Sequence, residues 1–400
     1  MLPVKIGKEV YFIGIRDWDR ELFDALIPLP NGTSYNSYVI KGKNKTALID
    51  TVDPQKWVVF SNSLKNFKDI DYVISNHAEQ DHSGSIGFVL EKYPKAKVVT
   101  NSKCRDFLRD HLHIPGDRFM VIKDGEELEL GEKTLKFIFT PWVHWPETMC
   151  TYLKEDQILF SCDLFGSHLA TGNMYSDDKK ISEPLKRYFA EIMLPFSANV
   201  GANMKKVDEY PLSLIAPGHG PLHRDINHIF ELYEDWTENS PKHKVLLMYV
   251  SMHKSTEILA SKLEQALYMR NIPVEVVNLE KGDLGKLAEE LVDSATVVLG
   301  VPTVLASPHP KAAYAAYLAN MLRPPVKYFG IIGSYGWGGK SLEIISALVS
   351  NLKAEVLKPV MVRGLATEKD FKEIEKLADI IKAKHDELKL KKVKTAAAEK

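Results

Sequence analysis

The chain has 400 residues, of which 45% are hydrophobic, and its 52 basic side chains nearly balance its 53 acidic ones. A net charge of -1 gives no electrostatic footprint for nucleic acid or for an anionic membrane surface. Its three cysteines form no C-x-x-C pair, which argues against a disulfide framework, a zinc ribbon or an iron–sulfur cluster. The N-terminus has no signal-peptide pattern, and no apolar run is long enough to span a bilayer. We therefore expect a cytoplasmic protein of two domains, or three.

The first half of the chain is typical of short strands separated by turns. The strand-like segments are "VYFIGI", "SYVIKGKNKTALID", "DYVISNH", "AKVVT", "LKFIFT" and "QILFSCD", and many of them end in a polar cluster. Helical periodicity is weaker here and is concentrated near residues 183–208 and 226–236. We assign residues 1–240 to the first domain.

From Val245 onward the pattern changes, because short apolar strands alternate with amphipathic helices. The helices are predicted at residues 255–270, 283–292, 310–322, 339–353 and 368–386. Five such βα units imply a parallel sheet that is covered by helices on both faces. We assign residues 241–388 to the second domain, and we regard residues 389–400 as a polar tail without a role.

The stretch "ISNHAEQDHSGS" places four ligand-type side chains in six positions directly after an apolar strand. They are His77, Glu79, Asp81 and His82. Further candidates stand at the ends of later strands, namely His144 in "TPWVHWPETM", Asp163 in "LFSCDLFG" and His219 in "IAPGHGPLHR". A single histidine or aspartate in a loop is more often a solvated or capping residue. Their recurrence at matching strand ends, where a scaffold can hold several loops together, favours a metal site.

The number of candidate ligands indicates how many metal ions they hold. A structural zinc site closes with four protein ligands and a simple catalytic site with three, whereas this set contains seven. Two neighbouring ions are therefore predicted, and a carboxylate such as Asp163 can bridge them.

The ligand loop resembles that of the metallo-β-lactamase superfamily, which usually reads H-x-H-x-D-H and mostly holds zinc in hydrolases. In this chain Glu79 stands in place of the second histidine. A carboxylate adds negative charge and a harder donor, which favours iron or manganese over zinc and stabilises an oxidised ion. Glu79 therefore indicates redox chemistry, although zinc also accepts carboxylate ligands.

Three loops of the second domain have the features of a mononucleotide site. "SMHKSTE" leads from the first strand into a helix, where hydroxyls and free N–H groups suit a phosphate. "GVPTVLASPHP" and "IIGSYGWGGKS" follow the third and fourth strands, and in a sheet of order 2-1-3-4-5 the three loops meet beside the switch point. Tyr335 and Trp337, among several glycines, can lie against a flat isoalloxazine ring. No G-x-G-x-x-G fingerprint occurs, so a dinucleotide is not favoured.

Together the two halves resemble the flavodiiron proteins, which reduce dioxygen to water or nitric oxide to nitrous oxide. The resemblance covers about residues 3–388 and is carried by "GTSYNSY", "HAEQDHSG", "TPWVHWP", "SCDLFG", "PGHGP", "SMHKSTE" and "GSYGWGG". It implies an α/β protein with an N-terminal metallo-β-lactamase-like αββα sandwich and a C-terminal flavodoxin-like doubly wound parallel sheet. It also implies a separate electron donor such as rubredoxin, and a head-to-tail homodimer or a dimer of dimers.

The same resemblance implies two iron ions and one flavin mononucleotide (FMN) per chain. One iron is expected on His77, Glu79 and His144 and the other on Asp81, His82 and His219, with Asp163 as the bridge. FMN is expected on Ser251, Met252, His253, Lys254, Ser255 and Thr256, on Pro302, Thr303, Val304, Leu305 and Ala306, and on Ser334, Tyr335, Gly336, Trp337 and Gly338. His223, where the family often has an aromatic residue, is a departure close to the assigned ligand His219. His253 and Lys254 also depart from the small or aromatic residues that are more usual in the phosphate turn.

Two other functions compete with this one. A di-zinc hydrolase with a flavodoxin-like appendage has Glu79 against it. A non-catalytic module for electron transfer or oxygen sensing would leave seven candidate ligands without a task. The sequence ranks neither dioxygen above nitric oxide nor one electron donor above another.

Overall fold

The structure, a computed structural model, describes residues 2–177 and 180–390. The chain forms two compact units, of which the first comprises Met1–Phe189 and Phe196–Glu234 and the second comprises Ala190–Pro195 and Asp235–Lys400. Our proposed domain boundary between residues 240 and 241 lies directly before the strand Lys242–Tyr249. Of the predicted tail, residues 391–400 lie outside the described part of the chain.

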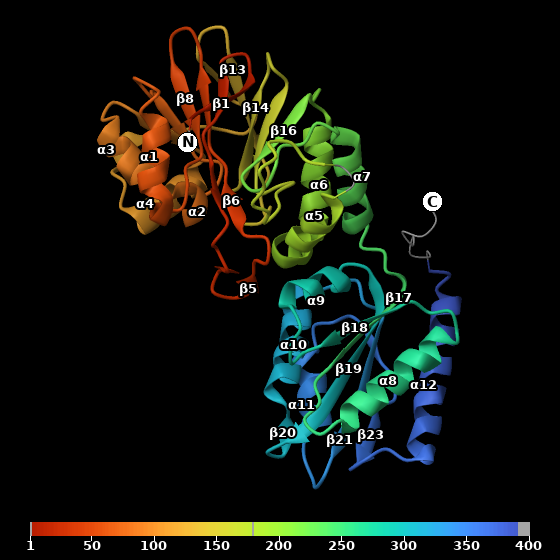
Figure 1. Cartoon of the computed structure of the whole chain (residues 1–400). Helices are drawn as coiled ribbons and strands as arrows, with labels where there is room; N and C mark the ends of the chain where they lie inside the picture. Colours follow the sequence, from red (N-terminus) through yellow and green to blue (C-terminus); the bar gives the residue numbers. More distant parts are fainter. Residues whose placement is uncertain (1, 178–179, 391–400) are drawn as a thin grey trace. The chain divides into compact units, whose positions relative to one another are not determined.

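The first unit contains two sheets (Figure 1). An apolar cluster contains side chains of both sheets. The first sheet has the order β1 (Val4–Gly7), β2 (Val10–Phe12), β7 (Tyr38–Lys41), β8 (Thr46–Ile49), β9 (Tyr72–Ile74), β10 (Lys97–Thr100) and β11 (Phe119–Val121). The second has the order β12 (Glu127–Glu129), β13 (Thr134–Phe139), β14 (Met149–Leu153), β15 (Ile158–Cys162) and β16 (Leu214–Pro217). Two short ribbons pair β3 (Ile15–Asp17) with β6 (Thr33–Tyr35) and β4 (Leu22–Phe23) with β5 (Ile27–Pro28).

The central strands of the first sheet are buried on both faces, and their side chains alternate between two apolar clusters. Tyr38 and Ile40 of β7 pack in the cluster between the two sheets. Val39, which lies between them in sequence, packs in the cluster on the other face, as do Leu48 of β8 and Val98 of β10. This alternation follows from the two-residue period of a strand, and it explains why these strands read as nearly continuous apolar runs.

Helices cover the outer faces of both sheets. Figure 1 shows α1, α3 and α4 beside the first sheet and α5, α6 and α7 beside the second, which confirms the predicted αββα sandwich. The helical segments between residues 54 and 237 are η1 (Pro54–Lys56), α1 (Trp57–Leu64), α2 (Gln80–Ser83), α3 (Ile86–Lys92), α4 (Ser102–Leu112), η2 (Gly116–Arg118), α5 (Ser182–Tyr188), a π-helix (Phe189–Met193), a 3₁₀ turn (Leu194–Phe196), α6 (Ser197–Asp208) and α7 (Ile226–Thr237). Of these, Ala190–Pro195 and the last residues of α7, from Asp235, are assigned to the second unit.

The expectation that helices of the first half lie mainly near 183–208 and 226–236 is incomplete. Helices are present there, but α1, α3 and α4 were not predicted. These helices have only 8, 7 and 11 residues, and α4 buries just Cys104 and Leu108. In helices with so few buried positions, apolar residues do not recur often enough for the helical period to be recognised in the sequence.

The second unit is built on a parallel sheet of order β18-β17-β19-β21-β22, which confirms the predicted order 2-1-3-4-5. Its strands are β17 (Lys242–Tyr249), β18 (Val274–Asn278), β19 (Ser294–Val304), β21 (Tyr328–Tyr335) and β22 (Glu355–Val356), and β20 (Ser307–Pro308) pairs with the end of β19. The predicted fifth strand is divided into β22 and β23 (Val360–Arg363). β22 pairs with the beginning of β21, at Tyr328 and Phe329, and β23 pairs with its end, from Ile332 to Tyr335. Pro359 lies in the break, and a proline has no N–H for the ladder.

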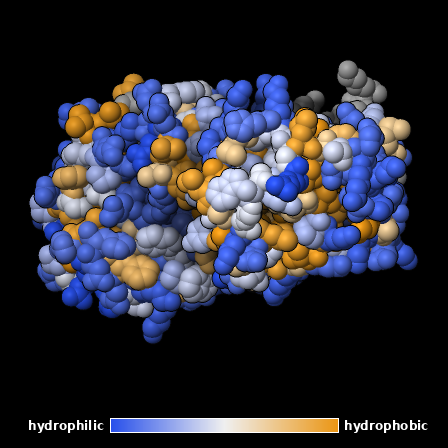
Figure 2. Space-filling view, turned by 90° about the horizontal axis from the view of Figure 1, so that it is seen from below, coloured by the Kyte–Doolittle hydropathy of each residue, from blue (hydrophilic) through white to orange (hydrophobic). Residues whose placement is uncertain are grey.

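Helices cover both faces of this sheet (Figure 1). On one face, α8 (Ser255–Tyr268) packs with α12 (Glu368–Glu387) through side chains such as Leu263 and Leu377. The other face carries α9 (Leu284–Leu291), α10 (Pro310–Leu322) and α11 (Ser341–Leu348). Seen from below, the molecule presents mostly hydrophilic side chains with hydrophobic ones between them (Figure 2). Within residues 2–177 and 180–390, none of the helices combines the length and the apolar character that a membrane crossing needs.

His385 is buried near the end of α12, against β19. Its Nε2 lies 2.7 Å from the hydroxyl oxygen of Thr296, and its Nδ1 lies 3.2 Å from Nδ1 of His243. Burial and the neighbouring His243 lower the pKa of His385 to about 4. A histidine in an unfolded chain titrates at a pKa of about 6.5, so between these values the unfolded chain binds a proton that the folded chain does not. The stability that this histidine contributes is therefore present above about pH 6.5 and is lost as the pH falls toward 4.

We expect the second unit to lose about 2 kcal/mol of its free energy of unfolding through His385 between pH 7 and pH 4.5, after an allowance for solvent screening. Hydrogen exchange of the β19 amides in the full chain measures this loss. The variant His385→Gln keeps a polar partner for Thr296 but does not titrate, so its pH dependence should be flatter. An equal slope in the variant and the wild type would show that another group causes the loss.

Candidate metal centre

The seven predicted metal ligands lie at or shortly after the ends of strands in the first unit. His77 and Glu79 follow β9, and the next turn, α2, carries Asp81 and His82. The others are His144 after β13, Asp163 directly after β15 and His219 after β16. The structure brings all seven side chains together in two adjacent groups.

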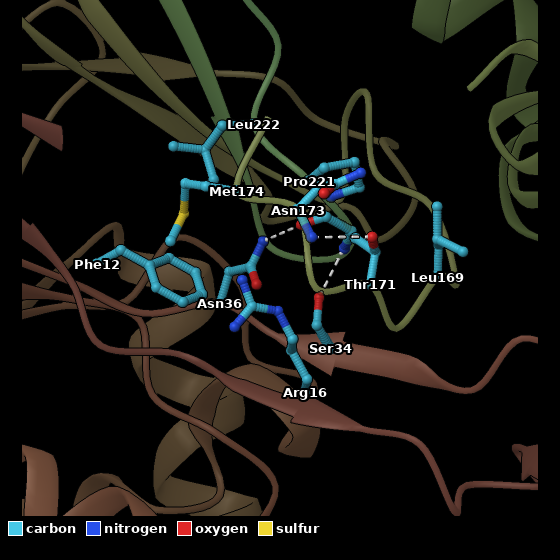
Figure 3. Close-up of a pocket in the computed structure, with 11 residues that line it drawn as sticks. Phe12, Arg16, Ser34, Asn36, Leu169, Thr171, Asn173, Met174, Pro221 and Leu222 are labelled. Atoms are coloured by element: carbon cyan, nitrogen blue, oxygen red, sulfur yellow. Dashed lines mark hydrogen bonds between the residues drawn. The ribbon is translucent and has the colours of Figure 1, made fainter. Parts of the chain in front are cut away.

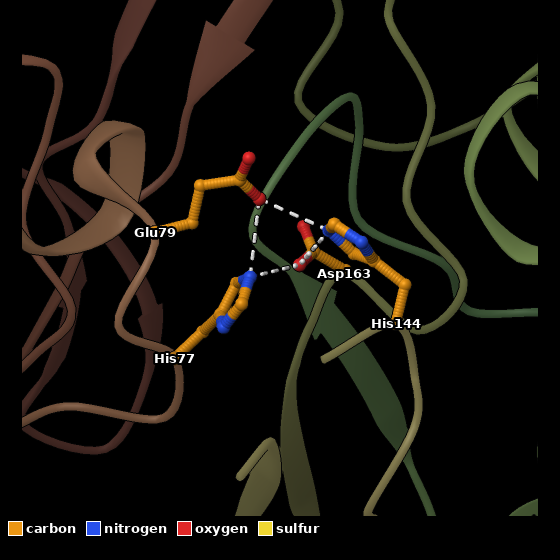
Figure 4. Close-up of side chains that lie close together, drawn as sticks. All are labelled: His77, Glu79, His144 and Asp163. Atoms are coloured by element: carbon orange, nitrogen blue, oxygen red, sulfur yellow. Dashed lines mark hydrogen bonds and ion pairs between the residues drawn. The ribbon is translucent and has the colours of Figure 1, made fainter. Parts of the chain in front are cut away.

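The first group consists of His77, Glu79, His144 and Asp163 (Figure 4). Oε2 of Glu79 lies 3.1 Å from Nε2 of His77 and 3.0 Å from Nε2 of His144. Oδ2 of Asp163 lies 3.4 Å and 3.6 Å from the same two nitrogens. Two imidazole nitrogens and two carboxylate oxygens therefore converge, which is a donor set that transition metals accept.

The second group consists of Asp81, His82 and His219. Nε2 of His219 lies 3.2 Å from Oδ2 of Asp81 and 3.1 Å from Nε2 of His82. Oδ1 of Asp163, the second oxygen of that carboxylate, lies 3.0 Å from Nε2 of His82. Asp163 thus turns one oxygen toward each group, which is the orientation that a bridging carboxylate needs.

Two glycines let the loop that carries His219 lie against its neighbours. A Cβ atom on Gly218 would lie 2.6 Å from Cε1 of His82. A Cβ atom on Gly220, which has a φ of +79°, would lie 2.1 Å from Oγ of Ser167. Both distances are too short for non-bonded atoms, and the positive φ also favours glycine. The two glycines of "PGHGP" are therefore required by the close packing around the centre.

Burial disfavours the charged forms of these side chains, but the opposite charges of the carboxylates and the imidazoles stabilise one another. Burial lowers the pKa of His219, but the carboxylates of Asp163 and Asp81 raise it to about 10. Burial raises the pKa of Asp81, but His82 and His219 hold it below its usual value. The neighbouring imidazoles lower the pKa of Glu79 in the same way against the effect of burial. The carboxylates therefore favour positive charge in both groups, either as protons or as metal ions.

The environment of the carboxylate oxygens shows that metal ions fit this cluster. Both oxygens of Asp81 and Oδ2 of Asp163 are buried and accept no well-formed hydrogen bond within the described part of the chain, and Oδ2 of Asp81 and Oδ2 of Asp163 lie 3.2–3.6 Å from imidazole nitrogens. The Nε2 atoms of His82 and His219 face each other at 3.1 Å, which two lone pairs disfavour unless a cation lies between or beside them. Because buried polar atoms normally have partners, the seven side chains fit two cations better than a hydrogen-bond network of their own.

His223 lies outside both groups. Its Nε2–H donates to the carbonyl oxygen of Phe165 at 2.9 Å, and its Nδ1 lies 3.1 Å from the hydroxyl oxygen of Ser176. Burial lowers its pKa to about 4, so the ring is neutral and structural. His219, and not His223, is therefore the histidine of this segment that belongs to the cluster.

The three cysteines, Cys104, Cys150 and Cys162, are buried free thiols. Cys162 is close to His82 and Asp163. Burial and the nearby carboxylate of Asp50 raise the pKa of Cys162 well above its usual value.

Three groups that the sequence analysis did not single out hold the ligands in place. Nδ1–H of His77 donates to Oε1 of Glu147 at 2.7 Å, the Tyr188 hydroxyl donates to Oδ1 of Asp163 at 2.8 Å, and Nδ1–H of His219 donates to the Ser34 carbonyl at 2.6 Å. Glu147 stands three residues after His144 in a quoted motif, so a signal was present. Ser34 likewise lies in the quoted motif "GTSYNSY", whereas Tyr188 gave no local signal, because only the fold brings it to the centre.

A small cavity lies beside the loop that carries His219 (Figure 3). Its lining includes Phe12, Arg16 and Asn36. The Nδ2 amide of Asn36 donates to the carbonyl oxygens of Pro217 and Gly220, both at 2.8 Å. Asn36 thus holds the loop on both sides of His219. None of the seven candidate ligands lines the cavity, so we regard its walls as support for the centre.

The three predicted flavin loops meet at the carboxyl edge of the second sheet. They comprise residues 251–256 after β17, 302–306 at the end of β19 and 334–338 at the end of β21. The hydroxyl oxygens of Thr256 and Ser334 lie 3.1 Å apart. The N–H of Lys340 donates to the carbonyl oxygen of Ala306 at 3.1 Å. The first loop therefore contacts the third, and the second loop contacts the residues that directly follow the third.

This edge has the features that a flavin phosphate and a flavin ring need. Lys254, with a φ of +66°, precedes α8 and supplies no side-chain cap to the helix N-terminus, where Oγ of Ser251 accepts the N–H of Glu257 at 3.2 Å. A helix N-terminus with hydroxyls beside it suits a phosphate. Among the described residues, nothing lies within 4 Å of a Cβ atom placed on Gly336. Leu305 and Trp337 are 88% and 71% exposed, so the edge offers apolar surface to a flat ring. The residues present fit FMN.

Comparisons with known proteins agree with one another. A family model described as "ODP family beta lactamase" matches residues 33–220. The nitric oxide reductase of Moorella thermoacetica is 32% identical over 366 residues, which are 89% of this chain and 91% of that protein. Rubredoxin oxygen:oxidoreductase from Desulfovibrio gigas is similar with a TM-score of 0.92 at 26% identity, covering 96% of this chain and 99% of that one. The flavodiiron protein from Giardia intestinalis has a TM-score of 0.89 at 27% identity, covering 96% and 98%.

Proposed function

Because the chain belongs to the flavodiiron proteins and is an oxidoreductase of that family, we propose that it reduces dioxygen to water, nitric oxide to nitrous oxide, or both. The observation that carries this proposal is the carboxylate of Asp163 between two ligand groups, one of which contains Glu79. The names of the relatives from Moorella thermoacetica and Desulfovibrio gigas support nitric oxide and dioxygen as substrates.

In this proposal His77, Glu79 and His144 hold one iron ion, Asp81, His82 and His219 hold the other, and Asp163 bridges them. FMN binds at the three loops of the second unit. When bound, two ferrous ions and one reduced FMN supply four electrons, which with four protons convert dioxygen to two waters, whereas two nitric oxide molecules need two electrons and two protons to form nitrous oxide and water.

The exposure of the ligands indicates the side from which a small gas approaches. The side chains of Glu79 and His144 are 14% and 12% exposed, whereas those of His77 and Asp163 are almost completely buried. We propose that substrate enters beside Glu79 and His144. The buried ligands keep bulk water away from the rest of the centre and fix the donor atoms in place.

We propose a separate small electron-transfer protein as the donor to FMN, with rubredoxin as the first candidate. The name of the Desulfovibrio gigas relative supports this class of donor. A head-to-tail homodimer or a dimer of dimers, and a cytoplasmic location, are part of the same proposal.

Metal and flavin content of the purified protein after iron-supplemented growth is the first test. We expect near two irons and one FMN per chain, and consumption of dioxygen or nitric oxide when reduced rubredoxin is supplied. The reason is that the donor set with Glu79 favours iron. Two zinc ions without flavin would instead support the di-zinc hydrolase. Bound iron and FMN without gas consumption would support a non-catalytic module.

A further inference from the structure

The imidazoles of the metal centre differ in what holds their second ring nitrogen. Nδ1–H of His77 donates to a carboxylate oxygen of Glu147 at 2.7 Å. Nδ1–H of His219 donates to a neutral acceptor, the carbonyl of Ser34, at 2.6 Å. Nδ1 of His82 is buried and has no hydrogen-bond partner among residues 2–177 and 180–390. The two ligand groups are therefore supported in chemically different ways.

Glu147 is firmly held in its position behind His77. The side chains of both residues are completely buried, and Oε1 of Glu147 also accepts the N–H of Ala78 at 3.1 Å. The carbonyl oxygen of Glu147 accepts Nδ2–H of Asn101 at 2.6 Å. The ring of Trp145 packs edge-on against His77, with ring centroids 5.0 Å apart. The imidazole of His77 is thus fixed between an aromatic ring and a carboxylate.

The two oxygens of the shared Asp163 carboxylate also differ in the hydrogen bonds that they accept. Oδ1, which faces His82 of the second group, accepts a hydrogen bond from Tyr188 at 2.8 Å. Oδ2, which faces His77 and His144 of the first group, accepts none from the described residues. A hydrogen bond takes up part of the charge of an oxygen, so Oδ2 is the stronger donor of the two.

We propose that Glu147 is a positioning residue that acts through His77 and makes the first group the tighter of the two metal positions. This inference rests on the proposed di-metal function. A carboxylate behind a ligating imidazole fixes the tautomer whose Nε2 lone pair faces the metal, and it raises the basicity of that nitrogen. The first group then combines Glu79, the charge of Glu147 behind His77 and the free oxygen of Asp163. The second group has Asp81, and only a neutral carbonyl stands behind His219.

Titration of the metal-free, full-length protein with cobalt(II), followed by its visible absorption, tests this order. The wild type should bind two ions in two steps of different affinity. Glu147→Gln keeps an acceptor for Nδ1–H but loses the charge, and it should weaken the tight step about 10-fold. Glu147→Ala loses both and should weaken that step about 100-fold. The weaker step should be unchanged in both variants.

Two results of this titration would overturn the inference. One is a tight step of wild-type affinity in folded Glu147→Gln and Glu147→Ala, and the other is an equal loss in both steps. Circular dichroism in the near ultraviolet checks that the variants are folded. Wild-type protein that binds fewer than two ions would contradict the proposed di-metal function, whereas two ions of equal affinity would contradict only this inference.

Variants of the metal ligands independently test which of the two positions binds more tightly, in case the Glu147 variants do not fold. His144 belongs only to the first group, and His219 belongs only to the second. His144→Ala should therefore lose the tight cobalt step and keep the weak one, and His219→Ala should do the reverse. If His219→Ala loses the tight step instead, the first group is not the tighter position.

Discussion

In Glu79→His, zinc should replace iron at the metal centre, and the consumption of dioxygen and of nitric oxide should fall by more than about 100-fold, the upper end of the effect of an outer-shell change. Oε2 of Glu79 lies 3.1 Å from Nε2 of His77 and 3.0 Å from Nε2 of His144, so it is central to the first group. A third imidazole there removes one negative charge and a hard oxygen donor. Both changes favour zinc and disfavour an oxidised iron ion.

Elemental analysis of protein from medium that contains both iron and zinc, together with gas-electrode assays, measures this exchange. FMN absorption should be unchanged, because the flavin loops belong to the other unit. Glu79→Asp is the matched control, since it keeps the charge and should retain iron, although it binds less tightly because the side chain is shorter. Iron content and oxidase turnover like those of the wild type in Glu79→His would contradict the electronic role of the glutamate.

Asp163→Asn should bind at most one metal ion with useful affinity and should lose gas reduction. The carboxylate offers one oxygen to each group, at 3.0 Å from Nε2 of His82 and at 3.4 Å from Nε2 of His77. An asparagine can place its oxygen toward only one group, and its NH₂ then points at the other, where it repels a cation. We expect the affinity for the second ion to fall by more than about 100-fold, since a direct ligand matters more than an outer-shell group.

Asp50→Asn is the matched control for this variant. Asp50 is as buried as Asp163 but lies outside both groups, and its two oxygens accept the backbone N–H and the Nδ2–H of Asn76 at 2.8 Å and 2.9 Å. The control should lose about 1–3 kcal/mol of stability through a mismatched hydrogen bond and still bind two ions. Isothermal titration with cobalt(II) compares the two variants. Two ions of wild-type affinity in Asp163→Asn would exclude a bridging role.

The two halves of the chain differ in how much of their fold could be predicted. In the second half, α8, α10 and α12 have 14, 13 and 20 residues, which is long enough to show the helical period, and parallel strands joined by helices allow few arrangements, so the order 2-1-3-4-5 was predicted correctly. In the first half, α1, α3 and α4 were missed because short helices that bury two or three residues have almost no periodic pattern. Tertiary packing, and not local propensity, stabilises such helices.

The chemical character of the candidate site could be predicted, because it depends on the types of the residues and not on their arrangement in space. The kinds of donor, their number and the glutamate at position 79 are properties of the residues themselves, and together they indicate two ions of a redox metal. The ligand loops follow β9 of one sheet and β13, β15 and β16 of the other, and loops that a rigid scaffold positions are where functional residues are usually found, so the ends of strands indicate the candidate loops. These features point to the seven residues that the structure brings together.

Only the tertiary structure decided how those residues are arranged. Asp163 faces both groups, His219 lies in the cluster while His223 turns away, and Glu147 stands behind His77. The Ser34 carbonyl and the His219 ring that it holds are separated by 185 positions in the chain. Side-chain direction and distances of a few ångströms depend on the packing of whole sheets and helices. Residue type and local period do not fix the contacts between side chains that are far apart in the sequence, which is why the contact of Tyr188 with Asp163 could not be predicted.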